Sequence, residues 1–142
     1  MCGSGDQQSD SSLYEGLAGF RFALRRFLAF SEAMTRAAGV TPSQYQAMLA
    51  IRTHPGGAIV IRQLANQMLL QHHGAVQLVD RLCDAGLTKR THAENDRRSV
   101  LVVLTAKGSR LLAKLALAHR NELMKHESLL AESLARLRNI ER

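Results

Sequence analysis

Cysteines, long apolar runs and a leader segment are scarce or missing in this 142-residue sequence, and each absence excludes a class of protein. The two cysteines, Cys2 and Cys83, are too few and too differently placed for a disulfide framework or a structural zinc site. No apolar run reaches the roughly 18 residues of a membrane span, and no charged and then apolar leader with a cleavage site is present. We therefore expect a soluble cytoplasmic protein in a reducing compartment, without a membrane partner.

Catalytic and metal-binding motifs are missing as well. The sequence has no Gly-rich phosphate loop, no serine nucleophile elbow and no zinc-protease helix. Its histidines, cysteines and carboxylates show no convincing metal-ligand spacing. His119 and His126 do have Glu122 and Glu127 as helical neighbours, but they lie in a segment that we expect to mediate dimerisation. The sequence thus predicts no enzyme, no metal site and no cofactor.

Positive charge is what the chain has in excess. Its 19 lysines and arginines outnumber the 12 acidic residues, which gives a net charge of +7 at neutral pH. Hydrophobic residues make up 46% of the chain, enough to build the core of one domain. The surplus of positive charge favours a polyanionic partner without identifying it.

The N-terminal part divides into two expected segments. Residues 1–12 are polar and have almost nothing to bury, so we expect a disordered arm. Residues 13–39 form a helix that ends near Gly39 and is apolar on more than one side, which suits an intertwined dimer. Its two apolar stripes are Leu13, Leu17, Phe20, Leu24 and Phe27, and Phe22, Ala23, Phe30 and Ala33.

Residues 40–110 carry the signals of a helix followed by a helix-turn-helix. Thr41 as N-cap and Gln44 reaching back, as in a capping box, start the first helix, which ends near His54. A short apolar segment, 58–60, fits one small strand. The two helices that follow have the inner-face residues Ile61, Leu64, Ala65 and Met68, then Ala75, Leu78, Val79 and Leu82, and the second ends in a Schellman motif at Gly86 and Leu87.

A β-hairpin is predicted next. Its strands are 87–92 and 100–104, and its tip, 94–99, carries two arginines and an aspartate. A cationic hairpin tip is a good probe for the electronegative minor groove of DNA. With the upstream helices, it makes the fold class mainly α with a small antiparallel β-hairpin, a winged helix-turn-helix.

The last segment, 111–142, is expected to form C-terminal dimerisation helices with a polar interruption at 125–128. A chain of this size cannot cover all of its apolar residues alone. They are Leu111, Leu112, Leu115, Ala118 and Leu123, then Leu129, Leu130, Leu134, Leu137 and Ile140.

Residues 40–112 resemble the MarR family of winged-helix transcription factors. The residues that carry the resemblance are Leu64 and Ala65, Leu78 to Leu82, Ala85 to Leu87, Asp96 to Arg98, and Leu104 to Gly108. The resemblance implies a homodimer that reads a pseudopalindromic operator in double-stranded DNA. It also implies a repressor of its own or a neighbouring promoter, released by a small, anionic aromatic effector.

The candidate DNA contacts lie on the second helix and in the wing. Gln77 offers the donor and acceptor that suit adenine, Arg98 is the first choice for the minor groove, and Asp96 is expected to pair with an arginine and thereby hold the loop. Lys107 and Arg110 are further candidates for phosphate contacts. The full set of DNA-binding candidates is Gln71, His72, His73, Gly74, Gln77, Arg81, Lys89, Arg90, Asp96, Arg97 and Arg98.

Two alternatives stay open at this point. Cys83 would sense oxidants in a redox-responsive regulator, whereas a small buried apolar role is the simpler interpretation. A winged helix that docks proteins and has lost DNA binding is the other alternative. Candidate residues for an anionic effector are Arg21, Arg25, Arg26 and His54, and the sequence does not select among them.

Overall fold

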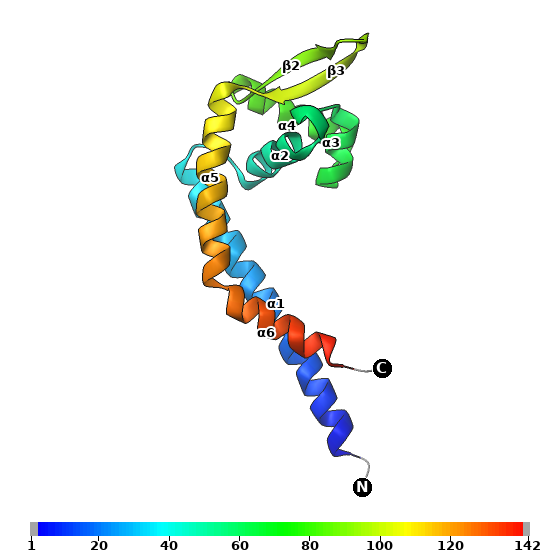
Figure 1. Ribbon diagram of the computed structural model, residues 1–142, viewed down its shortest axis with the longest axis vertical. Helices are drawn as coiled ribbons and strands as arrows, with labels where there is room; N and C mark the ends of the chain where they lie inside the picture. Colours follow the sequence, from blue (N-terminus) through cyan, green and yellow to red (C-terminus); the bar gives the residue numbers. More distant parts are fainter. Residues whose placement is uncertain (1–2, 141–142) are drawn as a thin grey trace. The chain divides into compact units, whose positions relative to one another are not determined.

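A computed structural model describes residues 3–140, apart from the side chain of Arg97 (Figure 1). The chain divides into two compact units, one of residues 34–117 and one that combines residues 1–33 with 118–142. Helix α1 (Ser4–Ala37) and helix α5 (Ala106–Lys125) each run through both units, and α6 (Glu127–Arg138) belongs to the second. None of the helices in the described part is long and apolar enough to cross a membrane.

The unit of residues 34–117 is a winged helix-turn-helix. In chain order it contains α2 (Pro42–Thr53), η1 (Pro55–Gly57), β1 (Ala58–Ile59), α3 (Ile61–Met68), α4 (His72–Asp84), β2 (Thr88–Ala93) and β3 (Asp96–Leu104). Its core is formed by fully buried side chains from most of these elements, including Met48, Ile51, Ile59, Leu64, Leu82 and Val102. The predicted fold class is therefore confirmed.

Local signals predicted the helix ends well. The Gln44 N–H donates to Thr41 Oγ1 over 3.1 Å, and the Thr41 N–H donates to Gln44 Oε1 over 2.9 Å, so the capping box is present. At the end of α4, Gly86 has a φ of 74°, and the Leu87 N–H donates to the Leu82 carbonyl over 3.0 Å. This is the expected Schellman motif.

The turn between α3 and α4 contains an unusual residue. Leu69 has a φ of 55° and is 93% exposed. A leucine in the left-handed region carries backbone strain, and here the strain reverses the chain between two helices. No sequence signal pointed to this conformation.

The wing has a tighter tip than predicted. The three strands pair antiparallel in the order β1-β3-β2, so the short segment before α3 adds a third strand to the expected hairpin. His92 pairs with Val100 but Ala93 pairs with Asp96, so residues 97–99 form a bulge in β3. The turn between the strands is residues 94–95, and the predicted loop 94–99 was too long.

The other unit contains an N-terminal helix that begins earlier than predicted. Helix α1 starts at Ser4 rather than near Leu13, so the expectation of a disordered arm was wrong for residues 4–12, and Met1 and Cys2 lie outside the described residues. A helix that packing has already nucleated downstream extends through polar residues at little cost. The Ser11 hydroxyl donates to Glu15 one turn later, over 3.3 Å, which supports this extension.

Small residues let α1 and α6 approach closely within this unit. A Cβ on Gly19 would lie 2.4 Å from Ser133 Oγ, and a Cβ on Gly16 would lie 2.9 Å from the Leu137 side chain. The Arg136 guanidinium pairs with the Glu15 carboxylate over 2.7 Å. The break between α5 and α6 falls at His126, inside the predicted polar interruption.

Candidate nucleic-acid interface

Helix α4 separates an apolar inner face from a polar outer face. Ala75, Leu78, Val79 and Leu82 are buried, as predicted from their spacing. The candidate DNA-binding residues Gln71, His72, His73, Gln77 and Arg81 are all exposed, and Gly74 is half-buried. The structure therefore brings the predicted base-reading residues together on one solvent-facing side of the helix.

The first turn of α4 has no side-chain cap. Its N-cap, Gln71, makes no side-chain capping bond. The N–H groups at a helix start are suited to binding an anion. One turn further, a ring nitrogen of His73 lies 3.2 Å from Gln77 Nε2, so these two candidate base contacts orient each other in the free protein.

Asp96 organises the wing through the main chain. Its Oδ1 accepts the Arg98 N–H over 2.9 Å, and its Oδ2 accepts the Ser99 hydroxyl over 3.2 Å. The predicted partner was an arginine side chain, and among the described contacts it is instead the backbone of Arg98. The Arg98 residue itself is exposed. The side chain of Arg97 lies outside the described residues.

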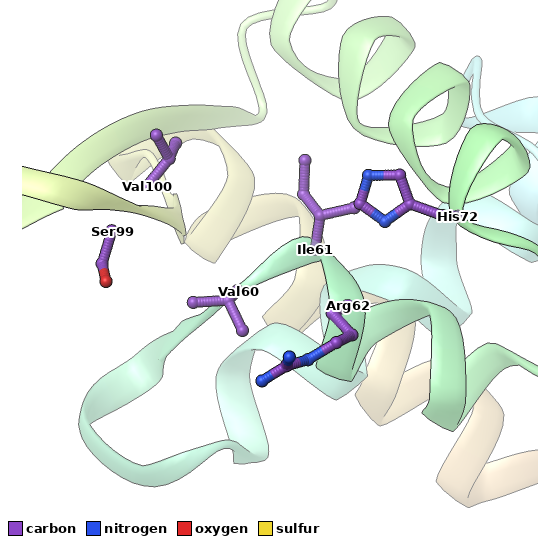
Figure 2. Close-up of a pocket in the computed structure, with 6 residues that line it drawn as sticks. All are labelled: Val60, Ile61, Arg62, His72, Ser99 and Val100. Carbon is purple, nitrogen blue, oxygen red and sulfur yellow. The ribbon is translucent and has the colours of Figure 1, made fainter.

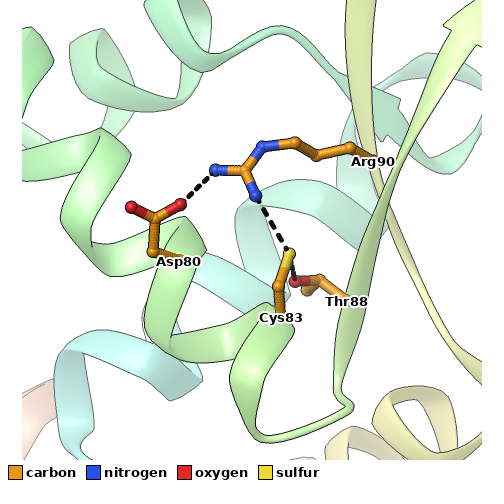
Figure 3. A network of polar contacts seen from close by, with 4 residues as sticks. All are labelled: Asp80, Cys83, Thr88 and Arg90. Carbon is orange, nitrogen blue, oxygen red and sulfur yellow. Dashed lines mark hydrogen bonds and ion pairs between the residues drawn. The ribbon is translucent and has the colours of Figure 1, made fainter.

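Arg90 has an internal partner that its sequence neighbours do not predict. Its guanidinium forms an ion pair with the Asp80 carboxylate of α4 and donates to Cys83 Sγ over 3.6 Å (Figure 3). The Arg90 and Asp80 side chains are 36% and 55% exposed, so the pair lies at the surface. Arg90, which the sequence predicts to contact a phosphate, is thus bound to α4 and connects strand β2 to that helix.

Cys83 is not simply a buried apolar residue. It is half-buried, and its Sγ lies 3.3 Å from the Thr88 hydroxyl as well as close to Arg90. The simpler interpretation from the sequence was therefore wrong about its surroundings, which are partly polar. Within the part of the chain that the structure describes, no three histidine, cysteine or acidic side chains gather as a metal site would require.

Lysine and threonine residues at the start of α5 bind the end of α4. Lys107 Nζ donates to the Ala85 carbonyl over 3.0 Å, so this candidate for a phosphate contact already has a main-chain partner. The Thr105 hydroxyl donates to the Gly86 carbonyl over 2.6 Å and accepts the Gly108 N–H over 3.0 Å. Thr105 is therefore the N-cap of α5. Lys89 and Arg110 are exposed.

The candidate effector residues are divided between the two units, with three arginines in one and His54 in the other. Arg21 and Arg25 are exposed on α1, and the Arg26 guanidinium lies 5.7 Å from the centre of the Phe22 ring. His54 is half-buried, with Nδ1 2.7 Å from the Ala58 carbonyl oxygen, so it holds the loop before β1. Their role toward an effector stays a prediction.

The helix-turn-helix, the polar face of α4 and the exposed hairpin define this chain as a winged helix-turn-helix protein. A model of the MarR family matches residues 38–99, which confirms for this segment the resemblance seen in the sequence.

Other proteins share part of this sequence or its fold. The transcriptional repressor MdtR of Bacillus subtilis is 31% identical over 49% of this chain and 44% of its own length. The structure of YusO from Bacillus subtilis has a TM-score of 0.63 and 26% identity, over 87% of this chain and 83% of YusO. A mutant MarR from E. coli complexed with operator DNA shares the fold, with a TM-score of 0.68 and 21% identity over 83% of this chain and 84% of its own.

The matched segment spans less than half of the length of the curated relatives. These relatives are named as transcriptional regulators, which agrees with the expectation of a non-enzymatic protein.

Proposed function

We propose that the chain is a DNA-binding transcriptional regulator of the MarR type. The observation that carries the proposal is the row of exposed polar residues on α4, which starts at His72 beside the wing strand β3. A helix with such a face fits the major groove, and an adjacent hairpin with an exposed arginine fits the minor groove. The net charge of +7 favours the same partner. The fold shared with a MarR protein on operator DNA supports it further.

The active form is a homodimer. The unit of residues 1–33 and 118–142 leaves large apolar side chains well exposed, among them Tyr14 at 66%, Phe22 at 53% and Leu28 at 53%. Large apolar side chains exposed in such number on one helical unit favour an interaction site. A twofold dimer would present two copies of α4 to the halves of a pseudopalindrome. Sedimentation equilibrium at micromolar concentration is expected to give the dimer mass, and a monomer mass would contradict this part.

We further propose repression of its own or a neighbouring promoter in the cytoplasm, with release by a small ligand such as an aromatic anion. The similarity to the repressor MdtR supports the sign of the regulation. An effector would act by changing the distance between the two copies of α4 in the dimer. A panel of aromatic carboxylates added to a preformed complex with DNA tests the release.

The direct experiment is the selection of bound duplexes from a random-sequence library, followed by competition with unselected DNA. A regulator enriches a pseudopalindromic sequence, and the selected duplex is competed poorly by random DNA. A winged helix that binds only proteins enriches nothing. A redox-responsive regulator, which the contact of Cys83 with Arg90 keeps as a second candidate, would lose binding on treatment with peroxide and retain it as Cys83→Ser.

A further inference from the structure

A groove of about 370 Å³ lies between the starts of the two helices and the wing. His72 at the start of α4 and Ser99 on β3 approach it from opposite sides, and the start of α3 lies between them (Figure 2). The residues that line it are Val60, Ile61, Arg62, His72, Ser99 and Val100. None of the candidate contacts predicted from the sequence included Arg62.

The position of this groove has a consequence that rests on the proposed function. When α4 occupies the major groove and the wing occupies the adjacent minor groove, one sugar-phosphate strand separates the two. That strand must cross the protein between α4 and the wing, where this groove lies. In helix-turn-helix proteins the first helix of the motif crosses the backbone, and here that helix is α3.

The chemistry of the lining suits a sugar-phosphate strand. Two groups can carry positive charge, the Arg62 guanidinium and the His72 imidazole, and no carboxylate lines the groove. Val60, Ile61 and Val100 form an aliphatic wall of the kind that packs against deoxyribose. A chain of alternating anionic phosphates and less polar sugars matches this combination.

Arg62 differs from Arg90 in the availability of its charge. Arg90 is paired with Asp80, whereas Arg62 is exposed and forms no ion pair with another described residue. The Ser99 hydroxyl already donates to Asp96, so Ser99 shapes the groove wall and does not supply a free donor. Arg62 is therefore the strongest available cation in the groove.

We propose that this groove holds the DNA strand between the major and minor grooves, with the Arg62 guanidinium bound to one of its phosphates. Arg62 is then a positioning residue: it sets the register of the protein on the duplex and does not read sequence. The contact releases a counterion from the DNA, so it contributes to the salt dependence of binding.

The test compares Arg62→Gln with Arg52→Gln, an exposed arginine on α2 that lines a different pocket. Both changes remove one positive charge, and glutamine retains good helix propensity. We expect Arg62→Gln to weaken binding about 10-fold to a duplex selected by the unchanged protein and to a random-sequence duplex alike. The slope of log K against log salt becomes shallower by about 0.9 per bound chain. Arg52→Gln leaves both quantities nearly unchanged.

Methylphosphonate duplexes locate the contact. Each duplex carries one neutral linkage. We expect one position of this linkage to lower the affinity of the unchanged protein, whereas the affinity of Arg62→Gln falls no further at that position, as in a double-mutant cycle. Arg62→Lys recovers part of the affinity because it restores the charge. If Arg62→Gln binds with unchanged affinity and salt slope while Arg98→Ala loses binding, the inference about the groove is wrong and the proposed function stands. If the unchanged protein selects no duplex, the proposed function itself fails.

Discussion

Gly108, near the start of α5, lies directly against the main chain of Leu87. A Cβ at position 108 would be 2.0 Å from the Leu87 carbonyl oxygen and 2.9 Å from its carbonyl carbon. The same Leu87 oxygen accepts the Thr105 N–H over 3.0 Å. Helix α5 therefore starts in contact with the segment that leaves α4, and only a residue without a side chain permits this approach.

We expect Gly108→Ala to destabilise the winged-helix unit by about 3 kcal/mol, because backbone cannot yield as a flexible side chain does. The matched control is Gly74→Ala on α4, where the nearest atom is 3.9 Å away. That change should be neutral or should stabilise by up to about 1 kcal/mol through helix propensity. Urea unfolding measures both, and equal effects of the two substitutions would contradict the close contact.

The packing of α1 on α6 gives a second stability prediction. Gly19→Ala pushes a methyl group against Ser133 and should cost about 1 to 3 kcal/mol. A change of Gly5→Ala in the same helix meets nothing within 4 Å and serves as the control. The double change of Gly19→Ala with Ser133→Gly is expected to recover part of the loss, as judged by thermal unfolding. A Gly19→Ala protein as stable as the control would refute this interpretation of the α1 and α6 contact.

Asp96 offers a prediction in which two effects have opposite signs. Asp96→Ala removes a negative charge from the wing, which by itself strengthens attraction to DNA. It also removes the acceptor of the Arg98 N–H and of the Ser99 hydroxyl, which loosens the loop. We expect the second effect to prevail, with affinity about 5-fold lower in fluorescence anisotropy, consistent with the loss of a bond to a charged acceptor. Tighter binding of Asp96→Ala would show that its hydrogen bonds do not matter for DNA.

Variants of Asp80 and Asp84 distinguish the release of Arg90 from its ion pair from the general effect of removing one negative charge. Both are exposed on α4, and Asp80 is the one paired with Arg90. Asp80→Ala frees a cation next to the DNA and should make the salt slope steeper by about one unit per bound chain. Asp84→Ala changes the net charge equally but frees no partner among the residues that the structure describes, so its slope should change less. Indistinguishable slopes would mean that Arg90 does not reach DNA even when released.

Variants of Arg98 and Gln77 distinguish a residue that holds the protein on any DNA from a residue that recognises the base sequence. Arg98→Ala should weaken binding to every duplex and flatten the salt slope by about one unit per bound chain. Gln77→Ala should lose about 1 to 3 kcal/mol of preference for the selected sequence while its binding to random DNA stays close to that of the unchanged protein. Competition assays at several salt concentrations measure both quantities. A Gln77→Ala protein with full sequence preference would remove Gln77 from the list of base contacts.

Signals within a few residues of each other predicted most of the fold. The capping box at Thr41 and the Schellman motif at Gly86 depend on neighbours in sequence, and the inner face of α4 follows from helical spacing. Helix α1 starts earlier than its polar first residues predict, because a helix that packs downstream extends through such residues. The wing turn was misplaced because a bulge changes strand register without changing the apolar pattern.

The candidate site was predicted less completely, because its details depend on partners that are distant in sequence. Polar residues on the outer face of α4 were identified by their spacing. The engagement of Arg90 by Asp80 and of Lys107 by the Ala85 carbonyl depends on how β2 and α5 return to the end of α4. Arg62 was missed because only the folded wing brings β3 beside the start of α3. The sequence signal that could have identified Arg62 is that it is a basic residue at the start of the first helix of the motif.

Thr105 has a mechanical consequence for the end of α4. Its hydroxyl donates a hydrogen bond to the carbonyl of Gly86, which follows α4, and also accepts one from the N–H of Gly108 in α5. Lys107 adds a second bond to the Ala85 carbonyl. The end of α4 is therefore bonded to the first turn of α5, and a change in the direction of α5 would be transmitted through these bonds to the helix proposed to read DNA.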